Sequence, residues 1–117
     1  KSLSDIFRLH KEYQGHTPWI LHDFNAGVTD LNNCHSKGIY TCFGPRFYES
    51  STAKISSTLL NNKIDLEYIF FETDDRRDIC ITDIYTQFAA RQAIDINQLR
   101  IQVWNNLAHL LGKNLTT

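Results

Sequence analysis

With 117 residues, the chain is long enough for one hydrophobic core, so its length predicts a single domain over residues 1–117. Its hydrophobic fraction of 42% and aromatic fraction of 12% exclude wholesale disorder. The net charge of −1 excludes a strongly basic nucleic-acid binder, and no apolar run approaches the roughly 18–20 residues of a membrane span. We therefore expect a soluble, cytoplasmic protein with no membrane partner.

The first part of the chain predicts one helix followed by two strands. Residues 2–13 carry a wide apolar side, with a capping serine at the start and Gly15 beyond the end. Residues 19–24 and 38–43 are rich in β-branched and aromatic side chains, which predicts strands. Residues 25–37 between them are rich in Asn, Asp, Gly and Ser, which is typical of turns. A turn there favours antiparallel pairing of the two strands.

The middle of the chain predicts a helix and a third strand. Residues 48–60 form a helix rich in Ser and Thr, and Asn61-Asn62 then turns the chain. Residues 66–71 form a nearly continuous apolar run, which predicts a strand in a central position of the sheet.

Residues 78–112 predict two helices joined at Ile94-Asp95. Asp95 occupies an N-cap position, and Gly112 occupies the position of a left-handed residue after the last helix. The last helix carries an apolar stripe, which predicts that it is buried and closes the core. The stripe consists of Ile96, Leu99, Val103, Trp104, Leu107, Leu110 and Leu111.

These elements predict an α+β domain with the order αββαβαα. We expect a small, mainly antiparallel sheet of three to four strands with the helices packed on one face.

Three cysteines, Cys34, Cys42 and Cys80, are an odd number, which favours free thiols in a reducing compartment. A bridge between Cys34 and Cys42 stays open as an alternative. Cys42 and Cys80 fall inside predicted elements, which predicts buried packing rather than nucleophilic use. The chain has no methionine, so either residues precede Lys1 or the domain is released from a longer polypeptide.

The histidines do not show the spacing of a metal site. His10 and His16 are six residues apart, and the adjacent Cys34 and His35 would point to opposite faces of a strand. The sequence also lacks a P-loop, a dinucleotide fingerprint, a nucleophile elbow and an HExxH motif. We therefore expect neither a metal nor a cofactor.

One group of residues is suited to metal-independent RNA cleavage. Such a centre needs a histidine as acid or base, a cation for the phosphorane charge and hydroxyl donors. The segment 34–41 supplies these groups, and a histidine of the preceding strand and an arginine beyond the segment can face it. The candidate residues are His22, His35, Lys37, Tyr40, Thr41 and Arg46. This pattern defines an alternative function, a small RNase toxin domain excised from a larger polypeptide.

The two closing helices define a second alternative, a helix-turn-helix-like DNA binder. The second helix begins Asn97-Gln98-Leu99-Arg100, with side chains that can read base edges. The polar face of this helix carries amide side chains and His109 rather than Lys or Arg, which argues against binding to DNA phosphates.

The one sizeable charge feature is acidic. Residues 63–78 carry three Lys or Arg against six Asp or Glu. Clustered carboxylates with aromatic side chains can complement the cationic active site of a nuclease. The predicted partner-binding residues are Tyr68, Glu72, Asp74, Asp75, Asp78 and Tyr85.

The sequence thus favours a non-catalytic domain that binds another protein. Its most specific form is an immunity- or antitoxin-like protein that neutralises a cationic nuclease toxin. The RNase and DNA-binding functions remain the alternatives, with nucleic acid a less favoured partner than protein.

Overall fold

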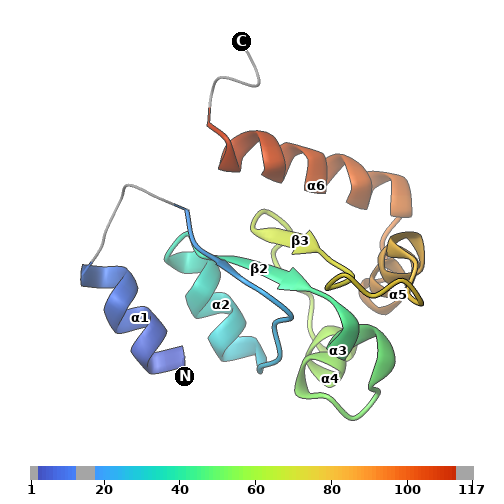
Figure 1. Cartoon of the computed structure of the whole chain (residues 1–117), viewed down its shortest axis with the longest axis horizontal. Coiled ribbons are helices and arrows are strands. Elements are labelled where there is room, and N and C mark those ends of the chain that lie inside the picture. Colours follow the sequence, from blue (N-terminus) through green and yellow to red (C-terminus); the bar gives the residue numbers. More distant parts are fainter. Residues whose placement is uncertain (1–2, 13–17, 113–117) are drawn as a thin grey trace.

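The computed structural model describes residues 3–12 and 18–112, and Figure 1 shows the arrangement of their helices and strands. In chain order these are α1 (Leu3–Glu12), β1 (Ile20–Leu21), α2 (Val28–Ser36), β2 (Tyr40–Phe43), α3 (Pro45–Glu49), α4 (Lys54–Asn61), β3 (Ile69–Phe71), α5 (Ile81–Gln92) and α6 (Ile96–Leu110). Residues 2, 13 and 15 of the predicted first helix and its end lie outside the described residues. None of the helices in the described ranges is long and apolar enough to cross a membrane.

The described strands form one parallel sheet with the order β1-β2-β3, so the predicted antiparallel pairing is wrong. Ile20 lies opposite Tyr40, and Thr41 lies opposite Ile69. The reason is that residues 25–37 contain the helix α2 instead of a turn. A helix between two neighbouring strands carries the chain back to the starting end of the sheet, so that the second strand runs parallel to the first.

The connection between β2 and β3 is also helical. Pro45 stands at the beginning of α3, where a helix tolerates proline because the first amide donors have no partner within the helix. The helix predicted over residues 48–60 is observed in part, as α4, which buries Ile55 and Leu59. The observed element order is therefore αβαβααβαα instead of αββαβαα.

The helices lie on both sides of the sheet, so the prediction of helices on one face is also wrong. Thr41 Oγ1 lies 2.9 Å from His35 Nε2 of α2, whereas the neighbouring Tyr40 hydroxyl lies 2.7 Å from His109 Nδ1 of α6. Because successive side chains of a strand point to opposite faces, α2 and α6 contact opposite faces of β2.

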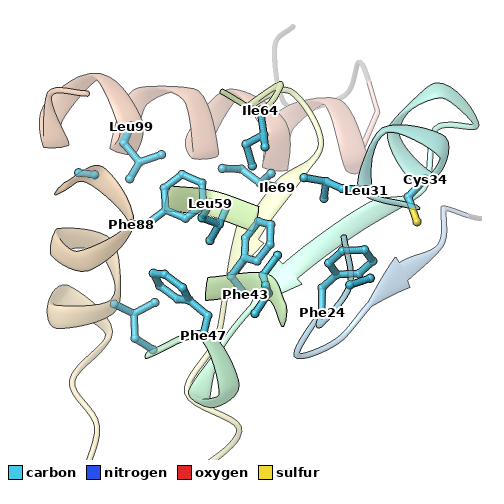
Figure 2. Packing of buried hydrophobic residues seen from close by; sticks show 14 of the residues in the cluster. Phe24, Leu31, Cys34, Phe43, Phe47, Leu59, Ile64, Ile69, Phe88 and Leu99 are labelled. Atoms are coloured by element: carbon cyan, nitrogen blue, oxygen red, sulfur yellow. The ribbon is translucent and has the colours of Figure 1, made fainter. Parts of the chain in front are cut away.

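The central strand is β2, not the predicted 66–71 strand. All four of its residues are buried, whereas β3 is an edge strand of the described sheet. Phe43 of β2 packs against Phe47, Phe71 and Phe88, with ring centroids 5.3–6.5 Å apart. Figure 2 shows Phe43, Phe47 and Phe88 converging from β2, α3 and α5. Edge-on and tilted contacts of this kind add about 0.5–1.5 kcal/mol per pair to the burial of apolar area.

The last helix matches its predicted ends but not its predicted burial. Asp95 caps α6 by accepting hydrogen bonds from the backbone amides of Asn97 and Gln98, and Gly112 has a φ of 87°. Of the predicted apolar stripe, only Leu99 is fully buried, and the Trp104 side chain is 67% exposed. The helix lies along β3 (Figure 1), and the Trp104 and Leu111 side chains of its apolar stripe remain largely exposed.

A buried asparagine joins α6 to the edge strand. The Asn106 amide, 2% exposed, donates to the carbonyl oxygens of Leu66 (2.8 Å) and Ile69 (2.9 Å), while its oxygen accepts from Gln102 Nε2 (2.9 Å). Edge strands leave carbonyl groups without a strand partner, and buried carbonyl groups need hydrogen bonds. Asn106 therefore replaces part of a neighbouring strand.

Substitution of this asparagine tests the arrangement. We expect Asn106→Ala to lower the free energy of unfolding by about 1–3 kcal/mol, because the buried Ile69 carbonyl and the part-buried Leu66 carbonyl lose their donor. Asn105→Ala is the matched control, since Asn105 is exposed on the same helix and should change stability by less than about 0.5 kcal/mol. Urea unfolding followed by circular dichroism measures both values, and equal effects of the two substitutions would contradict the assignment.

Candidate functional site

Parallel pairing brings the carboxyl ends of β1, β2 and β3 to one edge of the sheet. His22 and Asp23 follow β1, Cys42 lies near the end of β2, and Glu72 follows β3. In sheets of this type, binding and catalytic side chains gather at the carboxyl ends of the strands. This edge is therefore the candidate functional site.

The Glu72 carboxylate connects the ends of the two outer strands. Its Oε1 lies 3.3 Å from His22 Nδ1, and its Oε2 accepts a 2.6 Å hydrogen bond from the backbone amide of Asp23. Asp23 has a φ of 48°, a conformation that Asp adopts more readily than most residues. The two bonds fix both oxygens of Glu72 and hold the carboxylate beside the imidazole.

Asp23 in turn connects β1 to the segment after β2. Its Oδ1 accepts a 3.0 Å hydrogen bond from the backbone amide of Arg46, and its Oδ2 lies 3.8 Å from Arg46 Nε. The Arg46 side chain is otherwise largely exposed, so this ion pair contributes little to stability. It places a guanidinium group at the rim of the site.

Gly44 leaves the space that Glu72 occupies. A Cβ atom at this position would lie 2.9 Å from Glu72 Cγ and 3.1 Å from the Glu72 carbonyl oxygen. Contacts this short with the Glu72 side chain and carbonyl oxygen would displace the carboxylate, so the position favours glycine.

Cys42 adds a buried thiol to the same cluster. One ligand atom from each of His22, Cys42 and Glu72 lies within 4.8 Å of the other two, and no other such group occurs in the described ranges. Burial, followed by the nearby negative charge of Glu72, raises the pKa of the Cys42 thiol far above its usual value. These three residues could hold a metal ion. The spacing along the chain does not indicate them, because each lies in or just after a different strand.

A sharp turn follows Glu72 at the same edge. Asp74 and Asp75 both have positive φ values, 53° and 59°. The turn places two more carboxylates just after the cluster.

The structure separates the residues that predict an RNase. His22 and Arg46 lie at the carboxyl ends of the strands, whereas His35, Lys37, Tyr40 and Thr41 lie at or before the start of β2. His35 and Thr41 bind each other, and Tyr40 binds His109. Lys37 lines a separate hollow of about 590 Å³ with residues of α1, namely Phe7, Arg8, His10 and Lys11.

The predicted partner-binding residues are also distributed over the fold. Tyr68 precedes β3 and packs on Tyr40, whereas Glu72 lies in the cluster described above. Asp78 binds the exposed Arg76, which also pairs with Glu49. Asp74 and Asp75 lie in the turn after β3, and Tyr85 packs on Phe71 at 4.5 Å.

Arg100, one of the residues on which the DNA-binding alternative rests, lies on the exposed side of α6. It lines a hollow of about 270 Å³ beside Tyr85 and Trp104, at the edge of β3.

The parallel sheet with helices on both faces places the protein in the α/β class, so the predicted α+β class is wrong, and the sheet resembles part of a TIM barrel. No protein-family model and no curated protein sequence matches the chain. Its structure resembles the crystal structure of a hydrolase of the TatD family from Entamoeba histolytica, with a TM-score of 0.73 and 17% sequence identity. The likeness covers 94% of this chain and 48% of that one, so the chain spans about half the length of this structural neighbour.

The burial of His35 predicts that the folded protein loses stability at acid pH. Burial lowers the pKa of His35 from 6.5 to about 4, and its Nδ1 has no hydrogen-bond partner among the described residues. A histidine whose pKa is lower in the folded state stabilises the fold fully above the unfolded pKa and loses this contribution as the pH falls.

We therefore expect the free energy of unfolding to fall by about 3 kcal/mol more between pH 6.5 and pH 4 than in a His35→Gln variant, whose side chain does not titrate. Urea unfolding at several pH values measures the two slopes. Parallel pH profiles of the wild type and the His35→Gln variant would show that protonation of His35 does not cause the loss of stability.

The three thiols should differ in reactivity. Cys34 and Cys42 are buried and Cys80 is exposed, which corrects the predicted burial of Cys80, and all three are free. Burial raises the pKa of Cys34 to about 11 and raises that of Cys42 further. We expect Ellman's reagent to modify Cys80 roughly 100-fold faster than the other two in native protein, and all three at similar rates in denaturant. Rapid modification of the native Cys80→Ser variant would contradict the assignment.

Proposed function

We propose that the chain supplies part of the active site of a metal-assisted hydrolase, at the carboxyl ends of β1, β2 and β3. The observation that carries this proposal is the convergence of His22, Cys42 and Glu72 within 4.8 Å at this edge. The structural neighbour is a hydrolase, which agrees with the proposal. This chain spans about half the length of that neighbour. That this chain has a hydrolytic activity is therefore itself a proposal.

The residues of the cluster suit a divalent metal. Their donor atoms are an imidazole nitrogen, a sulfur and a carboxylate oxygen, which are the ligand types of catalytic zinc sites. The amide of Asp23 holds the second oxygen of Glu72, as outer hydrogen bonds commonly orient metal ligands. A metal bound there would lower the pKa of a coordinated water toward neutrality.

Other residues at the edge have roles that their positions favour. The Arg46 guanidinium lies at the rim, where it can stabilise negative charge that develops on a substrate. Asp74 adds a carboxylate two residues after Glu72 and is our candidate for accepting a proton from the attacking water.

The state of Glu72 favours a hydrolase over the predicted immunity function. Both oxygens of this carboxylate are engaged within the site, by His22 and by the Asp23 amide. A carboxylate that neutralises a cationic partner would instead have to face that partner. The protein-binding function, with Asp74 and Asp75 as its exposed charges, stays a separate prediction.

Hydrolysis of chromogenic substrates tests the proposal. We expect the full chain to hydrolyse at least one of 4-nitrophenyl acetate, 4-nitrophenyl phosphate and bis(4-nitrophenyl) phosphate when Zn²⁺ or Mn²⁺ is added. Glu72→Gln should lower kcat/KM at least tenfold, because the ligand loses its charge.

Glu67→Gln is the matched control, since Glu67 is exposed before β3, away from the cluster, and should leave the rate unchanged. Absence of hydrolysis with every metal and substrate, or equal rates for Glu72→Gln and Glu67→Gln, would overturn the proposal.

A further inference from the structure

Cys42 distinguishes this site from one built only of oxygen and nitrogen ligands. Its side chain is buried, with 4% of the residue exposed, and it lies on the central strand in register with Phe70. Among the described cysteines it is the one whose sulfur approaches a histidine and a carboxylate together. Burial on β2 gives the sulfur little freedom to move.

We infer that Cys42 is a thiolate ligand and that the site takes Zn²⁺, or another metal of similar softness, in preference to Mg²⁺ or Ca²⁺. Hard cations such as Mg²⁺ and Ca²⁺ select oxygen ligands, whereas zinc accepts sulfur, nitrogen and oxygen together. The inference rests on the proposed function only in that both concern the same site, since a metal ion can bind there whether or not the protein hydrolyses a substrate.

The distances agree with one tetrahedral ion. Two nitrogen or oxygen ligands about 2.0–2.1 Å from a zinc ion lie about 3.4 Å from each other in a tetrahedron. The observed distance between His22 Nδ1 and Glu72 Oε1 is 3.3 Å. A thiolate about 2.3 Å from the ion lies slightly farther from the other two ligands. The Cys42 sulfur lies within 4.8 Å of the ligand atoms of His22 and Glu72, which is compatible with this arrangement.

Three protein ligands leave the fourth position of the tetrahedron for water or a substrate, which is the pattern of catalytic rather than structural zinc. The surroundings supply both rigidity and access. The Asp23 amide orients Glu72, and the lack of a side chain at Gly44 leaves room for that carboxylate. The His22 side chain is 72% exposed, so an ion can reach the cluster from solvent.

Coordination exchanges a proton for the metal. The Cys42 S–H bond breaks, the sulfur keeps the electron pair and forms the bond to the ion, and the proton leaves to solvent. No oxidation or reduction takes place.

Titration with Co²⁺ tests the inference directly, because cobalt replaces zinc in such sites and shows a near-ultraviolet charge-transfer band only when a thiolate binds it. We expect the full chain to develop this band with one equivalent of Co²⁺. Excess Mg²⁺ should leave the band in place, and one equivalent of Zn²⁺ should remove it.

Cysteine variants identify the sulfur. A Cys34→Ala/Cys80→Ala double variant, in which Cys42 is the one remaining thiol, should keep the band. Cys42→Ser should lose it and bind Co²⁺ at least tenfold more weakly in a calorimetric titration, with circular dichroism as the check of folding. Cys80→Ser is the matched control and should behave like the wild type.

Cobalt binding without the band, a band that persists in folded Cys42→Ser, loss of the band in the double variant, or displacement of cobalt by Mg²⁺ would overturn the inference. These outcomes are independent of the hydrolase assay. Hydrolysis without a thiolate band would leave the proposed function standing and remove Cys42 from the ligands. A band without hydrolysis would confirm Cys42 as a ligand and overturn the proposed function.

Discussion

The parallel hydrogen bonding of β2 with both of its neighbours is the constraint on which the rest of the structure depends. It places the ends of the described strands at one edge, so that residues about 20 and 50 positions apart in the chain lie side by side. It also requires long connections, which explains why helices fill the segments between the strands. Antiparallel pairing of the same strands would have put His22 and Cys42 at opposite ends of the sheet.

Buried amide side chains connect the helices to this sheet. Asn106 donates to two carbonyl groups at the edge of β3, and Gln92 binds the carbonyl groups of Leu59 and Asn62 and the amide of Ile64. Each bond adds about 1 kcal/mol, but leaving the buried groups without partners would cost more. These amides therefore specify how α5 and α6 dock, while the hydrophobic core around Phe43 supplies the apolar burial.

The comparison with the TatD-family hydrolase bears on the fold alone. The likeness extends over 94% of this chain but only 48% of the neighbour. Here β1 and β3 are the edges of the described sheet, and Trp104 remains exposed beside β3. The candidate site lies at the carboxyl ends of these strands, since its three potential ligands come from the segment after β1, from β2 and from the segment after β3.

Local features of the sequence determined where most elements lie. Asp95 and Gly112 delimit the last helix, and the β-prone segments 19–24, 38–43 and 66–71 contain the three strands, because capping and strand propensity act over a few residues. The direction of the strands depended on α2, which has no side-chain hydrogen bond at its N-cap and is stabilised by burial of Leu31 and Cys34. Composition alone therefore indicated a turn. The proximity of His22, Cys42 and Glu72 was decided by the tertiary structure, because ligands contributed by separate strands leave no regular spacing in the chain.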